Sequence, residues 1–407
     1  MSGRTAVITG VGVVAPHGIG ADDHWKALSE GRSALAPIDR DGCTDLPLKV
    51  AGLVRGFDAE TYVEPRYLVQ TDRFTHFALA AAELAAADAG LADHPEDPYG
   101  VGVVTAAGSG GGEFGQCELQ HLWSEGPHHV GPYQSIAWFY AASTGQISIR
   151  GGFKGPCGVV ASDEAGGLDA LAHAARAVAR GTTDAVLAGA AEAPVAPYSM
   201  VCQLGYPGLS TEADPDRAYR PFGSDATGFV PGEGGAMFVV EEAGAARARG
   251  ARARARIAGH AATFTGAARW ADSREGLAHA IRGALAEAQC APDEVDVVFV
   301  DALGVPEADR AEALALADAL GDHAARVPVT APKAGLGRAH CGAPALDVAA
   351  AVLALEHGLV PPTPHTADCP YGLDLVTGRP RAAELRTALV LSRGLMGSNT
   401  ALLLRRA

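Results

Sequence analysis

The sequence predicts an α/β fold built from two similar halves, each a sheet flanked by helices. Short apolar segments that favour strands alternate with longer segments of helical periodicity along the 407 residues. The alternation occurs before an arginine-rich run at residues 247–256 and again after it. Because 48% of the residues are hydrophobic, the chain can bury a large core, and its length favours two or three lobes.

Composition excludes several classes of protein. A formal net charge of −15 argues against a nucleic-acid or anionic-membrane partner, because both need a basic surface. The seven cysteines are scattered without a CxxC pair, which indicates reduced thiols rather than disulfides or a metal site. No apolar run approaches the roughly 18 residues of a membrane span. We therefore expect a cytoplasmic protein without a bound metal.

The first half opens with a strand at residues 5–9, and Gly10 and Gly12 after it are expected to form a turn. The GVGVVAPHG segment is not a dinucleotide fingerprint, because no GxGxxG motif opens a helix there. An alanine-rich helix is predicted within residues 70–92 and a strand at residues 99–106, followed by a glycine-rich loop. If the segment that follows is helical, Gly112, Gly115 and Leu119 lie on one face of it.

The second half repeats this order. Strands are predicted at residues 257–262, 295–301, 327–330, 387–391 and 400–404, and helices at residues 273–289, 308–320 and 346–356. We expect residues 1–246 to form one half, residues 257–407 the other, and the basic run at residues 247–256 to be a solvated connector.

The stretch that organises the chain is a strand, a sharp turn and a long helix in direct succession. Residues 157–161 are apolar and favour a strand, whereas residues 168–180 have helical periodicity and end at Gly181. Such a strand-to-helix elbow presents one side chain to a cavity, and the helix N-terminus favours negative charge there. The residue at the tip is Glu164.

The run AGGLD at residues 165–169 resembles the nucleophile elbow of the β-ketoacyl synthases, in which a cysteine directly precedes it. Glu164 stands in the place of that cysteine. A chain with this run and no cysteine is similar to the chain length factor, or ketosynthase-β subunit, of type II polyketide synthases, which usually has glutamine here. The resemblance covers nearly the whole chain, from TGVGVVAP to SNTALLL, and implies a thiolase-like fold of duplicated αβαβα halves.

The resemblance also shows which catalytic groups are missing. An active ketosynthase pairs its cysteine with two histidines, and Leu303 and Arg338 occupy their positions here, whereas the family's lysine is retained as Lys333. The glycine-phenylalanine gate is altered too, and reads GLMGSN at residues 394–399. His340 follows the second lost position by two residues, and we expect that offset to direct it elsewhere. The chain is predicted not to condense acyl units itself.

Two interpretations of Glu164 follow. It can be a buried, hydrogen-bonded cap at the helix N-terminus. Alternatively, an ionised carboxylate would repel the carboxylate of a malonyl thioester by roughly 4 kcal/mol at an effective dielectric constant of about 20, and so oppose decarboxylation.

By resemblance, the chain pairs with a ketosynthase-α subunit in a heterodimer and acts with a phosphopantetheinyl acyl carrier protein, without another cofactor. The family's tunnel-shaping positions correspond to Gly112, Gly115 and Leu119, and to Tyr198 and Met200. The first three have small or absent side chains, which predicts a long tunnel and a long aromatic poly-β-ketone. Plain backbone flexibility is the alternative role of Gly112 and Gly115.

Trp138, Phe139 and Tyr140 form the largest aromatic cluster, and we expect a core or subunit-interface helix there. Alternative functions are a subunit of a reducing, polyene-forming type II system, a purely structural partner of the ketosynthase, and an active enzyme with unusual residues. We expect no activity from the chain alone, only as part of an acyltransferase heterodimer.

Overall fold

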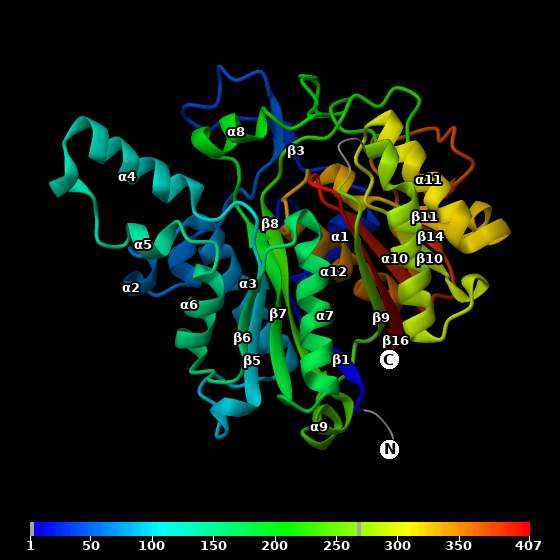
Figure 1. Cartoon of the computed structure of the whole chain (residues 1–407), viewed down its shortest axis with the longest axis horizontal. Coiled ribbons are helices and arrows are strands. Elements are labelled where there is room, and N and C mark those ends of the chain that lie inside the picture. The colour runs from blue at the N-terminus through cyan, green and yellow to red at the C-terminus, as the bar shows by residue number, and fades with distance from the viewer. Residues whose placement is uncertain (1–3, 267–269) are drawn as a thin grey trace.

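The computed structural model describes residues 4–266 and 270–407, which fold into five alternating layers of helices and sheet (Figure 1). Within these residues a 12-stranded sheet runs in the order β13-β11-β10-β15-β16-β9-β1-β8-β7-β5-β6, with β2 paired to β1. Strands β1, β2, β8, β7, β5 and β6 come from the first half of the chain and the others from the second. The predicted α/β, thiolase-like class is confirmed.

The first half contains the following elements: β1 (Ala6–Ala15), β2 (Gly18–Ile19), α1 (Ala21–Ser29), β3 (Leu35–Pro37), β4 (Val50–Gly52), α2 (Pro65–Leu68), α3 (Arg73–Ala89), β5 (Val101–Ala106), α4 (Gly112–Ser124), α5 (Gln134–Ala137), α6 (Ala142–Gly151), β6 (Cys157–Val160), α7 (Gly166–Ala179), β7 (Ala185–Glu192), α8 (Pro197–Gln203), β8 (Gly234–Glu242) and α9 (Ala243–Ala248).

The second half contains β9 (Ala255–Phe264), α10 (Ser273–Ala288), β10 (Val297–Phe299), α11 (Pro306–Leu320), β11 (Pro328–Thr330), α12 (Gly342–His357), β12 (Leu359–Val360), β13 (Asp374–Leu375), β14 (Arg381–Ala382), β15 (Thr387–Arg393) and β16 (Ser398–Arg406).

The expected turn at Gly10 and Gly12 is wrong, because both residues lie inside the fully buried strand β1. Their role is close packing against α3. A Cβ atom at Gly10 would lie 2.1 Å from the carbonyl oxygen of Ala85, and one at Gly12 would lie 1.9 Å from that of Ala81. Glycine is required here because the helix backbone approaches the strand too closely for any side chain.

Helices α7 and α12 form the central layer. Each contacts strands of both halves, α7 through β7 and β16, and α12 through β8 and β15. Nearly every residue of α12 is buried, in keeping with an apolar surface on all sides of the helix. The outer layers are α3 and α6 on the first half and α10 and α11 on the second. The N-terminus of α7 is therefore fixed between the two halves.

Most residues of the arginine-rich run are exposed, but ion pairs attach the run to the body of the molecule. It includes the end of α9 and the start of β9, and β9 joins the two halves by pairing Ala255 with Ile8 of β1. Arg254 is largely buried and lies 2.7 Å from Glu356, and Arg249 pairs with Glu241. The arginines of this run attach the connection to both halves.

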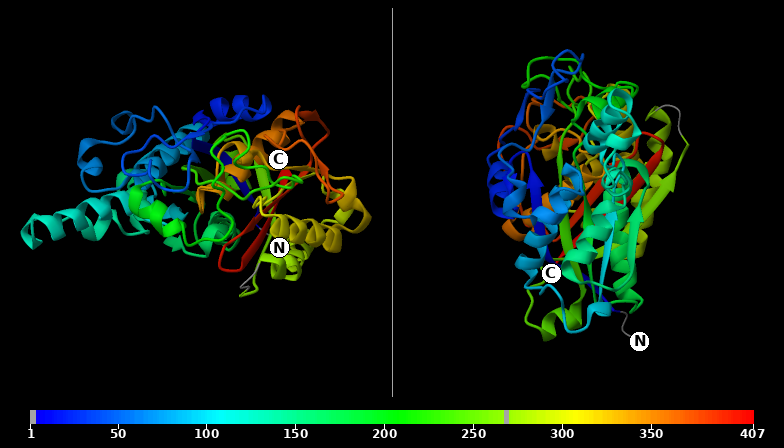
Figure 2. Two further views of the ribbon diagram at one scale, coloured as in Figure 1. Left: turned by 90° about the horizontal axis from the view of Figure 1, so that it is seen from above. Right: turned by 90° about the vertical axis from the view of Figure 1, so that its left-hand side faces the viewer.

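Helix α4 and the loop that follows it project from the body of the molecule (Figures 1 and 2). The helix packs against α5 and α8 near its first turns, and most of its side chains are exposed. A projecting helix with few intramolecular contacts gains little from its own core, which favours an interaction outside this chain.

Candidate functional site

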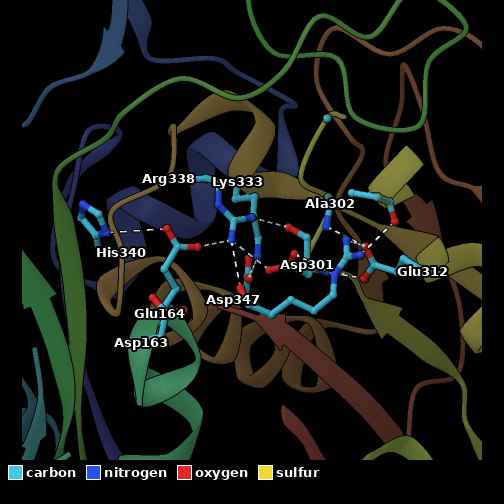
Figure 3. Close-up of polar contacts among 12 residues, drawn as sticks. Asp163, Glu164, Asp301, Ala302, Glu312, Lys333, Arg338, His340 and Asp347 are labelled. Carbon is cyan, nitrogen blue, oxygen red and sulfur yellow. Dashed lines mark hydrogen bonds and ion pairs between the residues drawn. The ribbon is translucent and has the colours of Figure 1, made fainter. Parts of the chain in front are cut away.

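The elbow links β6 to α7 through a short helical turn, Asp163–Ala165 (Figure 3). Asp163 has a φ of 58°, in the left-handed region that a residue with a side chain seldom adopts. Its Oδ2 atom accepts a hydrogen bond of 2.6 Å from the backbone N–H of Met396 in the loop before β16. The C-terminal loop thus holds the strained residue in place.

Glu164 is buried, with 3% of its surface exposed, and its carboxylate forms an ion pair with Arg338. Arg338 is buried to the same extent and also donates to the Asp301 carboxylate, at 3.1 Å, and to the Asp301 carbonyl oxygen, at 2.9 Å. The interpretation of Glu164 as a buried, hydrogen-bonded cap is confirmed in burial and hydrogen bonding, but its capping role is wrong, because no side chain caps α7. The partner of the Glu164 carboxylate is the buried guanidinium of Arg338, in a charge-assisted hydrogen bond, and not the backbone N–H groups at the start of α7.

This contact joins two of the lost catalytic positions. Glu164 occupies the place of the family's cysteine and Arg338 the place of its second histidine, and the two side chains bind each other. Because the carboxylate has a cationic partner, its charge is largely compensated. That compensation weakens the predicted repulsion of a malonyl carboxylate.

The ion pair belongs to a larger buried network of alternating charges, the elbow network, formed by Glu164, Arg338, Asp301, Arg393 and Glu312. Arg393 lies 3.1 Å from Asp301 and 2.8 Å from Glu312. Glu312 also accepts a hydrogen bond of 2.7 Å from the Asp301 backbone N–H. Burial opposes ionisation of Asp301, but the two arginines outweigh it and lower its pKa to about 2. Asp301 therefore stays charged at neutral pH.

Lys333 and Leu303 complete the set of positions predicted from the sequence. Lys333 lies 2.5 Å from Asp347, and both are buried. Burial raises the pKa of Asp347 to about 6 even with the lysine beside it. Leu303 lies in an apolar cluster with Tyr219 and Phe229, so the position of the family's first histidine holds no proton acceptor.

The prediction that His340 points elsewhere is wrong. A φ of 42° turns this residue toward the elbow, where its Nδ1 atom lies 3.6 Å from the Glu164 carboxylate. Its neighbour Cys341 is buried and lies with Sγ 3.0 Å from the Asp163 carbonyl oxygen. Burial and nearby carboxylates raise the pKa of the Cys341 thiol, which opposes formation of a thiolate.

A cavity of about 520 Å³, the elbow pocket, opens in front of these residues. Glu164 and His340 lie on its wall with the apolar side chains of Tyr206, Phe264 and Met396. The pocket can admit a small group. The described residues on its wall include no cysteine, and of its two serines Ser162 donates its hydroxyl hydrogen bond to the buried Asp169 carboxylate. The cysteine nucleophile of a condensing enzyme is therefore not among them.

A second cavity, the α4 recess, brings together four of the five predicted tunnel residues. It has a volume of about 400 Å³ and is lined by Gly112, Gly115, Leu119 and Tyr198, among others. Met200 is not among them. It is fully buried in a separate apolar cluster with Val195, because two positions along α8 carry it to the face opposite Tyr198.

The glycines of the α4 recess leave room for larger side chains. A Cβ atom at Gly115 would lie 3.6 Å from Trp138 Cβ, an ordinary van der Waals contact. At Gly112 it would meet the Ser199 hydroxyl at 2.1 Å, which requires that side chain to rotate. Both glycines lie within α4 rather than in a loop, so their absence of a side chain affects the recess directly.

The aromatic cluster is exposed and not part of the core of this chain. Trp138, Phe139 and Tyr140 have 51%, 40% and 39% of their surface exposed. Trp138 lines the α4 recess and Tyr140 lines the elbow pocket, so the cluster connects the two cavities. Other large apolar side chains exposed on α4, α5 and α8 are Trp123, Ile136, Tyr198 and Val201.

Sequence reasoning missed the outer part of the elbow network, namely Arg393, Glu312 and the position of Asp347. One signal was available for Arg393, which ends the largely apolar strand β15, TALVLSR. A charged residue in a buried strand indicates a buried partner. No such signal identifies the partner itself.

The described residues contain neither a candidate metal site nor a candidate membrane-spanning helix. Residues 4–266 and 270–407 contain no group of three or more potential metal ligands in a binding arrangement. They also contain no helix whose length and hydropathy suit a membrane span.

Comparison with known proteins relates this geometry to a family. The model of the β-ketoacyl synthase N-terminal domain matches residues 4–246, and that of the C-terminal domain matches residues 254–367. A polyketide beta-ketoacyl synthase 2 of Streptomyces coelicolor is 73% identical over 99% of this chain and 95% of its own length. The tetracenomycin polyketide synthase ketoacyl synthase beta subunit of Streptomyces glaucescens is 52% identical over 98% of each chain.

Solved structures show the same similarity. The ishigamide ketosynthase/chain length factor superposes with a TM-score of 0.89 at 28% identity and covers 100% of both chains. A type II polyketide synthase acyl-carrier protein in complex with its ketosynthase bound to the hexaketide gives a TM-score of 0.88, also at 28% identity and full coverage.

Proposed function

The chain belongs to the β-ketoacyl synthase family, and we propose that it is the non-condensing chain length factor of a type II polyketide synthase. The observation that carries the proposal is the ion pair between Glu164 and Arg338. These side chains occupy the positions of a nucleophile and a base, and each neutralises the other. Acyl transfer needs an activated nucleophile, which this arrangement does not provide.

The partner we propose is an active ketosynthase-α subunit in a heterodimer. The exposed aromatic residues that directly follow α5 are of the kind enriched in protein interfaces. Strand β6 is the outermost strand of the sheet on the same side of the molecule, with one edge unpaired. An unpaired edge beside an apolar surface is a site where another chain can add a strand.

In this heterodimer, the α4 recess would form part of the wall of the tunnel that holds the growing chain. Gly112, Gly115 and Leu119 leave this wall open, which supports a long poly-β-ketone. The carrier of that chain would be a phosphopantetheinyl acyl carrier protein, in keeping with the complex of a similar ketosynthase with its carrier protein. We place the assembly in the cytoplasm. The chain itself needs no cofactor besides the phosphopantetheine of the carrier protein.

Reconstitution tests this function. The full-length chain, the ketosynthase-α subunit and the acyl carrier protein are combined with malonyl units, and products are followed by mass spectrometry. We expect a polyketide only when both subunits are present, and none when the ketosynthase-α cysteine is replaced by alanine. A product formed by this chain and carrier protein alone would overturn the proposal.

A purely structural partner would give a different result. It would support product formation, but substitutions in the α4 recess would not change product length. Leu119→Phe, with 41% of the leucine exposed, is suited to separate the two functions because it should not disturb folding.

A further inference from the structure

A basic recess lies on the molecule away from both the elbow pocket and the α4 recess. It is formed by the start of β1, one face of α7, strand β9 and helix α10, and has a volume of about 360 Å³. Such a volume is within the range of small-molecule sites. Three arginines line it, Arg4, Arg176 and Arg256, with Glu287 as the one acidic side chain on its wall.

Small residues create the space in this basic recess. Ala172, Ala175 and Ala179 follow one face of α7, and Ala258 and Gly259 lie opposite them on β9. Because these side chains are short, the longer arginine side chains border an open volume rather than a packed one. Positive charge is thus concentrated in a chain whose formal net charge is −15.

Arg176 lacks an acidic partner in the described part of the chain. Its Nη2 atom lies 2.9 Å from Nδ1 of the buried His260, whose Nε2 atom lies 2.9 Å from the Asp169 carboxylate. A guanidinium can only donate, so Nδ1 of His260 accepts and Nε2–H donates to Asp169. The histidine orients Arg176 and brings no negative charge to the guanidinium.

The other charges of the basic recess are distributed unevenly. Arg256 is exposed and makes no side-chain hydrogen bond or ion pair within residues 4–266 and 270–407. The Glu287 carboxylate accepts a hydrogen bond of 2.6 Å from the His260 backbone N–H. Arg4 pairs with Asp184, outside the recess. Two guanidinium groups, from α7 and β9, that form no ion pair within the described residues thus border the same cavity, together with the single carboxylate of Glu287.

We propose that this basic recess binds the phosphate group of a small soluble ligand. Arginine presents its N–H groups in a planar fork that matches phosphate oxygens, and two such groups from different elements suit a phosphate or diphosphate. The site is separate from the proposed subunit contact, because β1, β8, β7 and β5 lie between β9 and the edge strand β6. It is therefore independent of the length-factor assignment.

Calorimetric titration of the full-length chain with inorganic pyrophosphate and, separately, with adenosine monophosphate tests the proposal. We expect saturable binding of at least one of them, with adenosine as an uncharged control that does not bind. Tight binding of the nucleotide alone identifies an organic phosphate as the ligand, whereas equal binding of both identifies the phosphate group itself. No binding of either at millimolar concentration overturns the proposal.

The double variant Arg176→Gln/Arg256→Gln locates the site. Loss of two charge-assisted contacts should weaken binding by about tenfold or more. Arg252→Gln is the matched control, because Arg252 belongs to the same basic run, has a side chain 77% exposed and does not line the recess. Unchanged affinity in the double variant, or an equal loss in the control, would contradict a specific site.

Discussion

The elbow network and the surface formed by α4, α5 and α8 differ in nearly every physical respect. At the elbow, Glu164, Arg338 and Asp301 are buried and charged, and each has a partner. On the α4 surface, side chains are apolar, small or absent, and Trp138 and Leu119 are exposed around an open cavity. The charged side chains of the elbow are held by partners within the chain, whereas the α4 surface exposes apolar side chains that have no such partners among the described residues.

The difference separates residues that stabilise the fold from residues that shape a cavity. In the proposed function, a mutually satisfied ion pair stands where a condensing enzyme has a nucleophile and a base, and it is compatible with the fold because a buried charge is tolerated only with a partner. An exposed apolar surface adds nothing to the stability of the isolated chain, which is why it indicates a partner or a ligand. The elbow network then serves to stabilise the fold, and the α4 surface serves to shape the tunnel for the product.

The largest effect is expected from breaking the elbow network. Arg338→Leu leaves Glu164 and Asp301 without this cation in a buried site, and should lower the free energy of unfolding by about 3–5 kcal/mol. Urea denaturation measures the change. Arg274→Leu, which breaks the exposed pair with Asp318, serves as the control and should change stability little. A similar small change for both variants would show that the elbow ion pairs do not hold the site together.

The coupling between the two lost catalytic positions is the next effect in size. Glu164→Gln combined with Arg338→Leu removes the uncompensated carboxylate, so the double variant should be more stable than Arg338→Leu alone. We expect a coupling energy of about 1–3 kcal/mol in a double-mutant cycle of denaturation midpoints. Additive losses would mean that the two side chains act independently despite their contact.

One buried titratable group differs from the elbow network in having no hydrogen-bond partner among the described residues. His24 is fully buried, neither ring nitrogen has a hydrogen-bond partner within the described residues, and burial lowers its pKa from 6.5 to about 3. Between about pH 6.5 and about pH 3 the unfolded chain therefore binds a proton at His24 that the folded chain does not bind. The free energy of unfolding consequently decreases as the pH is lowered through this window. His24→Leu removes this loss and should gain about 1 kcal/mol over the parent between about pH 7.5 and about pH 5.5.

Urea denaturation of both proteins at the two pH values measures that gain. His173→Leu is the control, because His173 is exposed on α7 and its replacement should not change the pH dependence. If His24→Leu and the parent lost stability equally on acidification, burial of His24 would not be the cause.

The smallest effect on stability is expected on the α4 surface. Leu119→Phe places a larger side chain at a position already 41% exposed, so the free energy of unfolding should stay within about 0.5 kcal/mol of the parent value. Thermal denaturation measures it. A large loss would mean that Leu119 supports the fold rather than only lining the α4 recess.

The sequence predicts most of the fold because its strands and helices carry clear periodicity, and the elbow and its lost catalytic positions because they lie in short contiguous motifs. It does not predict that Glu164 and Arg338 touch, since 174 positions separate them and only the central layer brings them together. The position of His340 depends on a positive φ, and the orientation of Met200 depends on the start of α8. Gly10 and Gly12 were misassigned because a glycine required by close packing has the same sequence pattern as a glycine in a turn.

In the proposed function, the α4 recess sets the length of the product while the elbow takes no part in chemistry. The most direct measurement is the mass of the polyketide made by the ketosynthase-α subunit with the parent chain, with Gly115→Phe or with Leu119→Phe. We predict a shorter product with each variant, and an unchanged product with the control His121→Phe, which lies on α4 outside the recess. A product of parental length from both recess variants, with the heterodimer still formed, would contradict the account.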